Sequence, residues 1–269
     1  MPGRIARALT TAQAERRGAL IPFLTSGFPD PAESDRLALA VCEEGADALE
    51  LGVPFSDPLA DGPVIQETTR RALAAGATLA GAIGQARRIR ALHETPIVLM
   101  TYVNPVLRYG PERFGRDAAE AGVDGVILVD LPPGEDPPLW SAMDASGLDT
   151  ITLVAPTTDP VRLPSITARA RGFLYVVARL GVTGGGDADP GLAGLLARCR
   201  EHTALPRCVG FGIDPRSDLS RYRGLAEGII VGSGLLSTIL SEPDAPSRER
   251  AARSFLRAIR ARLPDLSAR

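Results

Sequence analysis

A stretch that reads ALELGVPFSDPLADGP, residues 48–63, decides the fold. Leu49, Leu51 and Val53 form a short strand-like run. Pro54 ends this run, because proline has no N–H to donate to a strand ladder. Two further prolines and a glycine follow by residue 63, a composition that favours a stiff loop over a helix. The stretch therefore predicts a β-strand with Glu50 toward its carboxyl end, followed by a rigid loop.

Seven other short β-branched runs share this character, and segments with a helical pattern separate them. The eight expected strands cover residues 20–25, 48–53, 97–102, 125–130, 150–155, 172–178, 207–211 and 228–231. Most are apolar throughout, as strands of a parallel sheet buried on both faces are. We therefore expect residues 1–269 to form a single α/β domain, a (β/α)8 TIM barrel with a parallel eight-stranded core and an additional N-terminal helix. A doubly wound sheet is the main alternative, but the strand count, the even spacing and the lack of a glycine-rich loop after the first strand argue against it.

The basic residues exclude several kinds of chemistry. All thirty are arginine, so the chain cannot form a lysine Schiff base, hold pyridoxal phosphate covalently or complete a Walker phosphate loop. The only histidines are His93 and His202, and the only cysteines are Cys42, Cys199 and Cys208. Their spacing matches no zinc or iron site, so we expect no bound metal.

Charge and hydropathy narrow the class of partner. A formal charge of -2 and a pI near 5.8 come from interspersed arginines and acids, which form no basic stripe for nucleic acid. No run of about 18 apolar residues predicts a membrane span, and the first residues lack a signal-peptide pattern. Three cysteines without paired spacing fit a reducing compartment. We therefore expect a soluble, cytoplasmic protein that binds neither nucleic acid nor membrane.

Two carboxylates, Glu50 and Asp61, stand eleven positions apart across the loop that follows the second strand. In a barrel, functional residues gather at the carboxyl ends of the strands, so paired acids at this place indicate acid/base chemistry. A structural alternative stays open: Glu50 as an ordinary strand-end residue, and Asp61 as the N-cap of a helix that begins near Pro63.

Glycines follow the last three expected strands and favour a phosphate site there. The loop after the sixth strand contains Gly184, and Gly212 follows the seventh strand. Gly232 and Ser233 follow the eighth strand and precede a helix expected to open at Leu235. Glycines with an exposed helix N-terminus at these places bind phosphate in many barrels, although flexible connectors have the same composition.

These residues together resemble a known family. Residues 50–66 are similar to the signature of the tryptophan synthase alpha subunit, a long motif with a low chance of random occurrence. Matching motifs recur in order over nearly the whole chain, at residues 22–27, 102–105, 130–132, 181–184, 210–213 and 232–233.

The resemblance implies a carbon–carbon lyase of tryptophan biosynthesis, which cleaves indole-3-glycerol phosphate to indole and glyceraldehyde 3-phosphate in a retro-aldol reaction. Glu50 would then protonate the ring carbon and take the hydroxyl proton, while ionised Asp61 accepts the indole N–H bond. Because Glu50 stands against apolar walls and Asp61 in a loop, we expect the pKa of Glu50 to be the more raised of the two.

The resemblance also assigns residues to the substrate. The substrate-binding residues would be Phe23, Tyr102, Ile127, Val129, Leu153, Tyr175 and Thr183, with Met100 and Val177 in the same apolar slot. The phosphate-binding residues would be Gly184, Gly212, Gly232 and Ser233. Thr183 would orient Asp61 when the loop after the sixth strand closes. Each apolar residue of this set also fits an ordinary place in the barrel core.

A partner follows from the same resemblance: a pyridoxal-phosphate beta subunit that receives indole in an alpha2beta2 assembly, while this chain holds no cofactor. The interface residues would be Pro54, Phe55, Asp57, Asn104 and Pro132. The chain departs from the family pattern in residues 185–190 and around residues 133–134, where we expect the helix after the fourth strand to begin. Two alternatives stay open: a free-standing indole-3-glycerol-phosphate lyase, and a catalytically silent barrel that activates a partner, against which the presence of both carboxylates argues.

Overall fold

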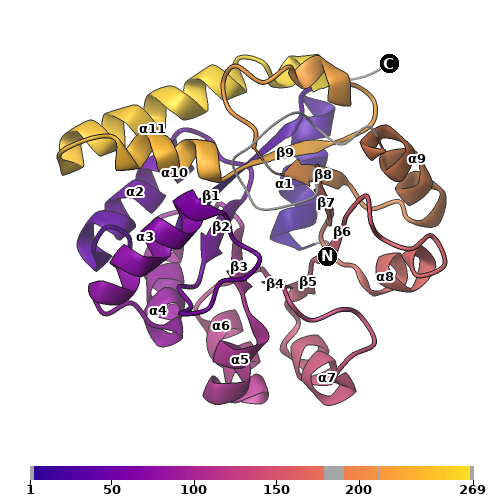
Figure 1. Cartoon of the computed structure of the whole chain (residues 1–269), viewed down its shortest axis with the longest axis horizontal. Coiled ribbons are helices and arrows are strands. Elements are labelled where there is room, and N and C mark those ends of the chain that lie inside the picture. Colours follow the sequence, from indigo (N-terminus) through magenta and orange to yellow (C-terminus); the bar gives the residue numbers. More distant parts are fainter. Residues whose placement is uncertain (1–2, 179–190, 211, 267–269) are drawn as a thin grey trace.

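The computed structural model describes residues 3–178, 191–210 and 212–266, which form a barrel of parallel strands surrounded by helices (Figure 1). The strands are β1 (Ala19–Thr25), β2 (Leu49–Gly52), β3 (Ile97–Thr101), β4 (Gly125–Leu128), β5 (Asp149–Thr150), β6 (Thr152–Val154), β7 (Leu174–Val177), β8 (Arg207–Gly210) and β9 (Gly228–Val231). Their order in the sheet is β5-β4-β3-β2-β1-β9-β8-β7-β6, and every pairing is parallel. The predicted TIM barrel is confirmed, since each expected strand has its counterpart.

The fifth expected strand is divided into β5 and β6 at Ile151. β5 pairs only with β4, and β6 pairs only with β7. The first part of this barrel strand is therefore bonded to the strand on one side, and the second part to the strand on the other side. The barrel wall is therefore interrupted between β4 and β6, at the carboxyl ends of these strands.

The helices of the described residues lie around the strands in Figure 1. They are α1 (Arg4–Ala14), α2 (Pro31–Glu43), α3 (Pro63–Ala74), α4 (Leu79–Arg90), α5 (Val103–Tyr109), α6 (Pro111–Glu120), α7 (Pro137–Ser146), α8 (Leu163–Arg169), α9 (Leu192–His202), α10 (Ser233–Leu240) and α11 (Ala245–Arg260), with short 3-10 turns η1 (Leu219–Tyr222) and η2 (Leu263–Leu266). Local chemistry sets where they start: Asp30 and Thr78 accept hydrogen bonds from first-turn N–H groups of α2 and α4. α7 begins at Pro137, so the expected helix start at residues 133–134 is wrong.

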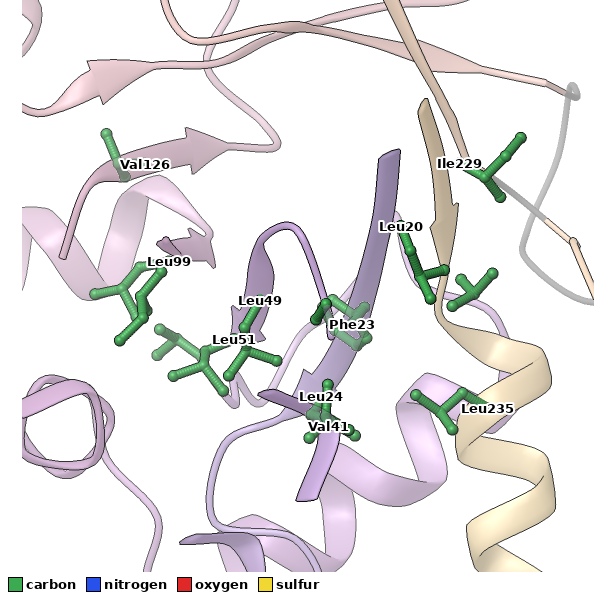
Figure 2. Packing of buried hydrophobic residues seen from close by; sticks show 14 of the residues in the cluster. Leu20, Phe23, Leu24, Val41, Leu49, Leu51, Leu99, Val126, Ile229 and Leu235 are labelled. Atoms are coloured by element: carbon green, nitrogen blue, oxygen red, sulfur yellow. The ribbon is translucent and has the colours of Figure 1, made fainter. Parts of the chain in front are cut away.

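Two separate apolar cores explain why the strands are apolar throughout. The larger core fills the space between strands and helices, where Leu20, Leu49, Leu99 and Ile229 point outward from their strands (Figure 2). The smaller core fills the barrel itself with side chains such as Ile21, which alternates with its outward neighbour. Each strand is therefore buried on both faces, as parallel strands are.

Helix α1 closes the amino-terminal end of the barrel. Ile5 and Leu9 of this helix belong to the interior core, together with side chains from the strands. Arg17 lies just after the helix, and Asp47 lies just before β2. The Arg17 guanidinium donates two hydrogen bonds to the Asp47 carboxylate, at 2.6 and 2.8 Å. With this end sealed, the interior is accessible from the carboxyl ends of the strands.

Within the described ranges, every helix is too short or too polar to cross a membrane.

Candidate active site

A cavity of about 160 Å³ opens at the carboxyl ends of the strands. Its walls come from β1, β3, β6, β7 and β9, from the loops after β2, β4, β8 and β9, and from the first turns of α3 and α10. The lining residues are Phe23, Ala60, Asp61, Ile65, Met100, Val129, Leu153, Tyr175, Val177, Gly212, Ile230, Gly232 and Ser233. An apolar slot with a carboxylate on one side and glycines on another suits a planar apolar ligand that carries an anionic group.

Glycines in the strands leave room for the aromatic walls of this cavity. A Cβ on Gly210 of β8 would lie 2.5 Å from the Tyr175 hydroxyl oxygen, and a Cβ on Gly52 of β2 would overlap the Phe23 ring. Larger residues at these two positions would displace both rings. The cavity therefore depends on small residues beside large ones on neighbouring strands.

Asp61 lies in the β2–α3 loop and does not cap the following helix. The N-cap of α3 is Gly62, and no side chain caps its first turn. The Tyr102 hydroxyl instead donates to Asp61 Oδ2 at 3.2 Å and accepts from the Ala60 N–H at 3.0 Å. The Gln66 amide fixes the loop by donating to the Asp61 carbonyl at 2.8 Å. The carboxylate is thus held toward the cavity, and the structural alternative of an N-cap is wrong.

Glu50 lies inside β2, as its second residue, and not at the end of the strand as expected. Its side chain is 1% exposed, and neither carboxyl oxygen has a hydrogen-bond partner among the described residues. Burial, with a smaller contribution from the Asp61 charge, raises the pKa of Glu50 to about 8. A buried carboxyl group without partners is costly to keep, which makes it a candidate for acid chemistry at neutral pH.

The two carboxyl groups differ as the sequence predicts. Burial raises the pKa of Asp61 to about 6, and the hydrogen bond from Tyr102 opposes that rise. At neutral pH, Glu50 is then mostly protonated and Asp61 mostly ionised. One group can give a proton while the other stabilises positive charge.

The opposite side of the cavity offers backbone groups. Ser233 is the first residue of α10, so the free N–H groups of the first helical turn lie at the cavity wall. Gly212 has a φ of +66°, a backbone conformation that glycine adopts without strain. This wall could receive an anionic group.

Comparison with known proteins decides the family. The profile of the family described as tryptophan synthase alpha chain matches residues 9–261. The tryptophan synthase alpha chain of Gluconacetobacter diazotrophicus is 48% identical over 247 residues, which span 91% of this chain and 90% of that protein. That of Desulfosudis oleivorans is 44% identical over 245 residues, 90% of this chain and 92% of that protein.

The chain belongs to the tryptophan synthase alpha chain family.

Solved structures agree with this assignment. The tryptophan synthase alpha chain of Legionella pneumophila superimposes with a TM-score of 0.88 and 35% identity, covering 100% of both chains. A chain of Mycobacterium tuberculosis tryptophan synthase gives a TM-score of 0.87 and 34% identity, covering 97% of this chain and 99% of that one. The likeness extends over the whole barrel.

Most substrate residues expected for a tryptophan synthase alpha chain line the cavity: Phe23, Val129, Leu153 and Tyr175, with Met100 and Val177. Ile127 does not line it, because its fully buried side chain packs deeper in the barrel interior. Tyr102 lies outside the lining too, and reaches Asp61 instead. Thr183 and Gly184 fall outside the described residues. The expected phosphate residues Gly212, Gly232 and Ser233 do line the cavity.

Sequence reasoning missed three lining residues, Ala60, Ile65 and Ile230. Ile65 and Ala60 flank Asp61 in the same motif, so their nearness to the carboxylate was a usable signal. Ile230 stands two positions before Gly232, which places both on the inner face of one strand and its continuation.

The interface residues expected for a tryptophan synthase alpha chain lie in the loops after β2 and β4 and at the start of α5. Asp57, Asn104 and Pro132 are exposed, whereas Pro54 is buried. Phe55 stacks on Tyr102 with ring centroids 5.2 Å apart. The same tyrosine therefore contacts the loop that carries the expected interface and the carboxylate of Asp61.

Proposed function

We propose that this chain catalyses the carbon–carbon lyase reaction of tryptophan synthase, the cleavage of indole-3-glycerol phosphate to indole and glyceraldehyde 3-phosphate. The observation that carries the proposal is one cavity bounded by Asp61 and the α10 N-terminus, with the partnerless carboxyl of Glu50 buried in the adjoining strand. Family membership agrees with this reaction.

The substrate would bind with its indole ring among Phe23, Leu153 and Tyr175, and with its phosphate at the backbone of Gly232 and Ser233. Apolar burial orients the ring, and helix N–H groups are suited to a phosphate. This placement directs the indole N–H toward Asp61. Glu50 does not line the cavity, so the proposed reaction requires its side chain to turn toward the ring when substrate binds.

The bond then breaks without an electron sink from the protein. Glu50 gives its proton to carbon 3 of the indole, and the ring becomes an indoleninium cation that Asp61 stabilises through the N–H. Glu50, now ionised, takes the proton of the side-chain hydroxyl, and the oxygen electrons form the aldehyde carbonyl. The electrons of the broken carbon–carbon bond return to the ring and restore indole. Glu50 ends in its starting protonation state.

We propose further that the chain acts as the alpha subunit of an assembly with a beta subunit. Membership of the tryptophan synthase alpha chain family supports this, and Leu59 in the β2–α3 loop, which is 89% exposed, would offer such a partner an apolar contact. Pyridoxal phosphate would belong to that partner, and this chain would need no cofactor for its own step.

Indole release from indole-3-glycerol phosphate by the purified chain, alone and with a beta subunit, tests both statements. Indole formed slowly by the chain alone and much faster with the partner is the expected result. Full activity without any rise on addition of the partner would contradict the subunit assignment. Absence of indole under both conditions would overturn the proposed reaction.

A further inference from the structure

A second cavity, of about 400 Å³, lies at the interruption of the barrel wall. β4 pairs with β5 only at Gly125 and Val126, and the Ile151 N–H donates to the Val126 carbonyl at 3.0 Å. Beyond that hydrogen bond, β6 pairs with β7 and turns away from β4. The gap left in the wall continues into the cavity, between the β4–α7 loop and the β6–α8 loop.

The floor of this second cavity is apolar and firmly held. Leu128 of β4, Trp140 of α7 and Ile166 of α8 are buried there. The Arg169 guanidinium lies 4.8 Å from the centre of the Trp140 ring and donates to Asp144 at 2.8 Å. An indole ring fixed in this way offers a flat surface to an apolar group.

The rim, by contrast, carries exposed charges of both signs. The Arg162 guanidinium makes no hydrogen bond or ion pair with any other residue that the structure describes. Asp130 accepts one hydrogen bond, from the Val103 N–H, and Asp159 accepts one, from the Val161 N–H. The second oxygen of each carboxylate has no partner in the described part of the chain. Opposite charges therefore face one cavity without neutralising each other.

We propose that this second cavity binds the zwitterion of an α-amino acid with a large apolar side chain. The ligand carboxylate would pair with Arg162, whose planar guanidinium suits a carboxylate. The ligand ammonium would pair with Asp130 or Asp159, and the side chain would lie on Trp140. A cavity of this volume is of the size that holds small molecules.

Simpler ligands fit the rim less well. An anion without an ammonium group would face two carboxylates, and a cation without a carboxylate would leave Arg162 unpaired. An uncharged ring would pair neither with Arg162 nor with the two carboxylates. Val129 and Leu153 line both cavities, so a ligand here would touch two walls of the active site. The inference does not depend on which reaction that site catalyses.

The chain contains one tryptophan, Trp140, which lines this cavity, so its fluorescence can report on a ligand bound there. No tryptophan lines the first cavity, and substitutions separate binding at the two places. The full chain is titrated with L-phenylalanine, with phenylacetate and with phenethylamine at one pH and ionic strength. We expect saturable changes for phenylalanine, with an affinity about tenfold above that of either singly charged analogue, the ratio expected for one charged hydrogen bond.

Substitutions locate the site. Arg162→Gln should weaken phenylalanine binding about tenfold, and Thr157→Tyr should block it by filling the rim from an exposed position. Arg171→Gln, an exposed arginine outside the lining, is the matched control and should leave binding unchanged. Equal affinity for the three probes, no saturable change, or unaltered binding by the Arg162 and Thr157 variants would overturn the proposal.

Discussion

Replacing Glu50 by glutamine should make the protein more stable at neutral pH, by an amount that grows with pH. The pKa of Glu50 rises from 4.5 to about 8 in the fold, mainly through burial. The folded protein thus keeps a proton that the unfolded chain releases above pH 4.5. Stability from this protonated group is complete below that pH and is lost as the pH rises toward 8.

The size of the effect follows from the same shift. Each pKa unit corresponds to about 1.4 kcal/mol, so the ionisable side chain costs the wild type about 3 kcal/mol of unfolding free energy between pH 4.5 and pH 7. Glutamine cannot ionise and escapes this loss. The glutamine amide is buried without partners, as the protonated carboxyl group of the wild type is, so this cost is similar in both proteins and the same at every pH.

Urea unfolding of both proteins from pH 5 to pH 8, followed by circular dichroism, measures the difference. Glu135→Gln, in the exposed β4–α7 loop, is the matched control and should give a constant offset. Curves for wild type and Glu50→Gln that stay parallel across this range would refute the reasoning, because Glu50 would then titrate in the fold as it does in water.

Three further outcomes are expected at the active site. Tyr102→Phe removes the hydrogen bond to Asp61, so the pKa of Asp61 should rise, and the acidic limb of kcat/KM against pH should move up by roughly half a unit to one unit; Tyr109→Phe, remote from the cavity, should not move it. The same profile of the wild type should be bell-shaped, with limbs near pH 6 and pH 8, because one carboxyl must be ionised and the other protonated. An unchanged limb in the first case, or a flat profile between pH 5 and pH 9 in the second, would contradict these pKa assignments. Gly210→Ala should lower the free energy of unfolding by about 1–3 kcal/mol, measured by thermal unfolding, since its methyl group would press on Tyr175; a gain in stability would show that the ring moves freely.

Much of this fold could be predicted from the sequence because each buried strand is apolar along its own short segment. Apolar runs such as Ile97–Thr101 can be recognised as strands without knowing which segments pack beside them. The division at Ile151 was not predictable, because it depends on which part of this strand pairs with β4 and which part pairs with β7. The predicted start of α7 at residues 133–134 was wrong because the proline and glycine there are turn-forming residues. The residue that caps the helix, Asp136, lies further along the chain.

The proposed catalytic pair could be predicted from the sequence for a different reason. Glu50 and Asp61 are acids within a motif, and their pKa order follows from strand against loop. The hydrogen bond from Tyr102 to Asp61 could not be predicted, since the hydroxyl reaches the carboxylate only when β3 lies beside β2. The resemblance predicted Ile127 in the substrate slot, but it does not show how deep a side chain lies in the barrel, and Ile127 packs in the interior core.

The proposed proton transfer is tested most directly by the rate of indole formation by Glu50→Gln at saturating indole-3-glycerol phosphate. General acid/base catalysis contributes about 10²–10⁴-fold, so turnover should fall by that factor while substrate binding persists. Glu135→Gln should keep the wild-type rate. Near-normal turnover by the Glu50 variant would contradict the assignment of Glu50 as the proton carrier.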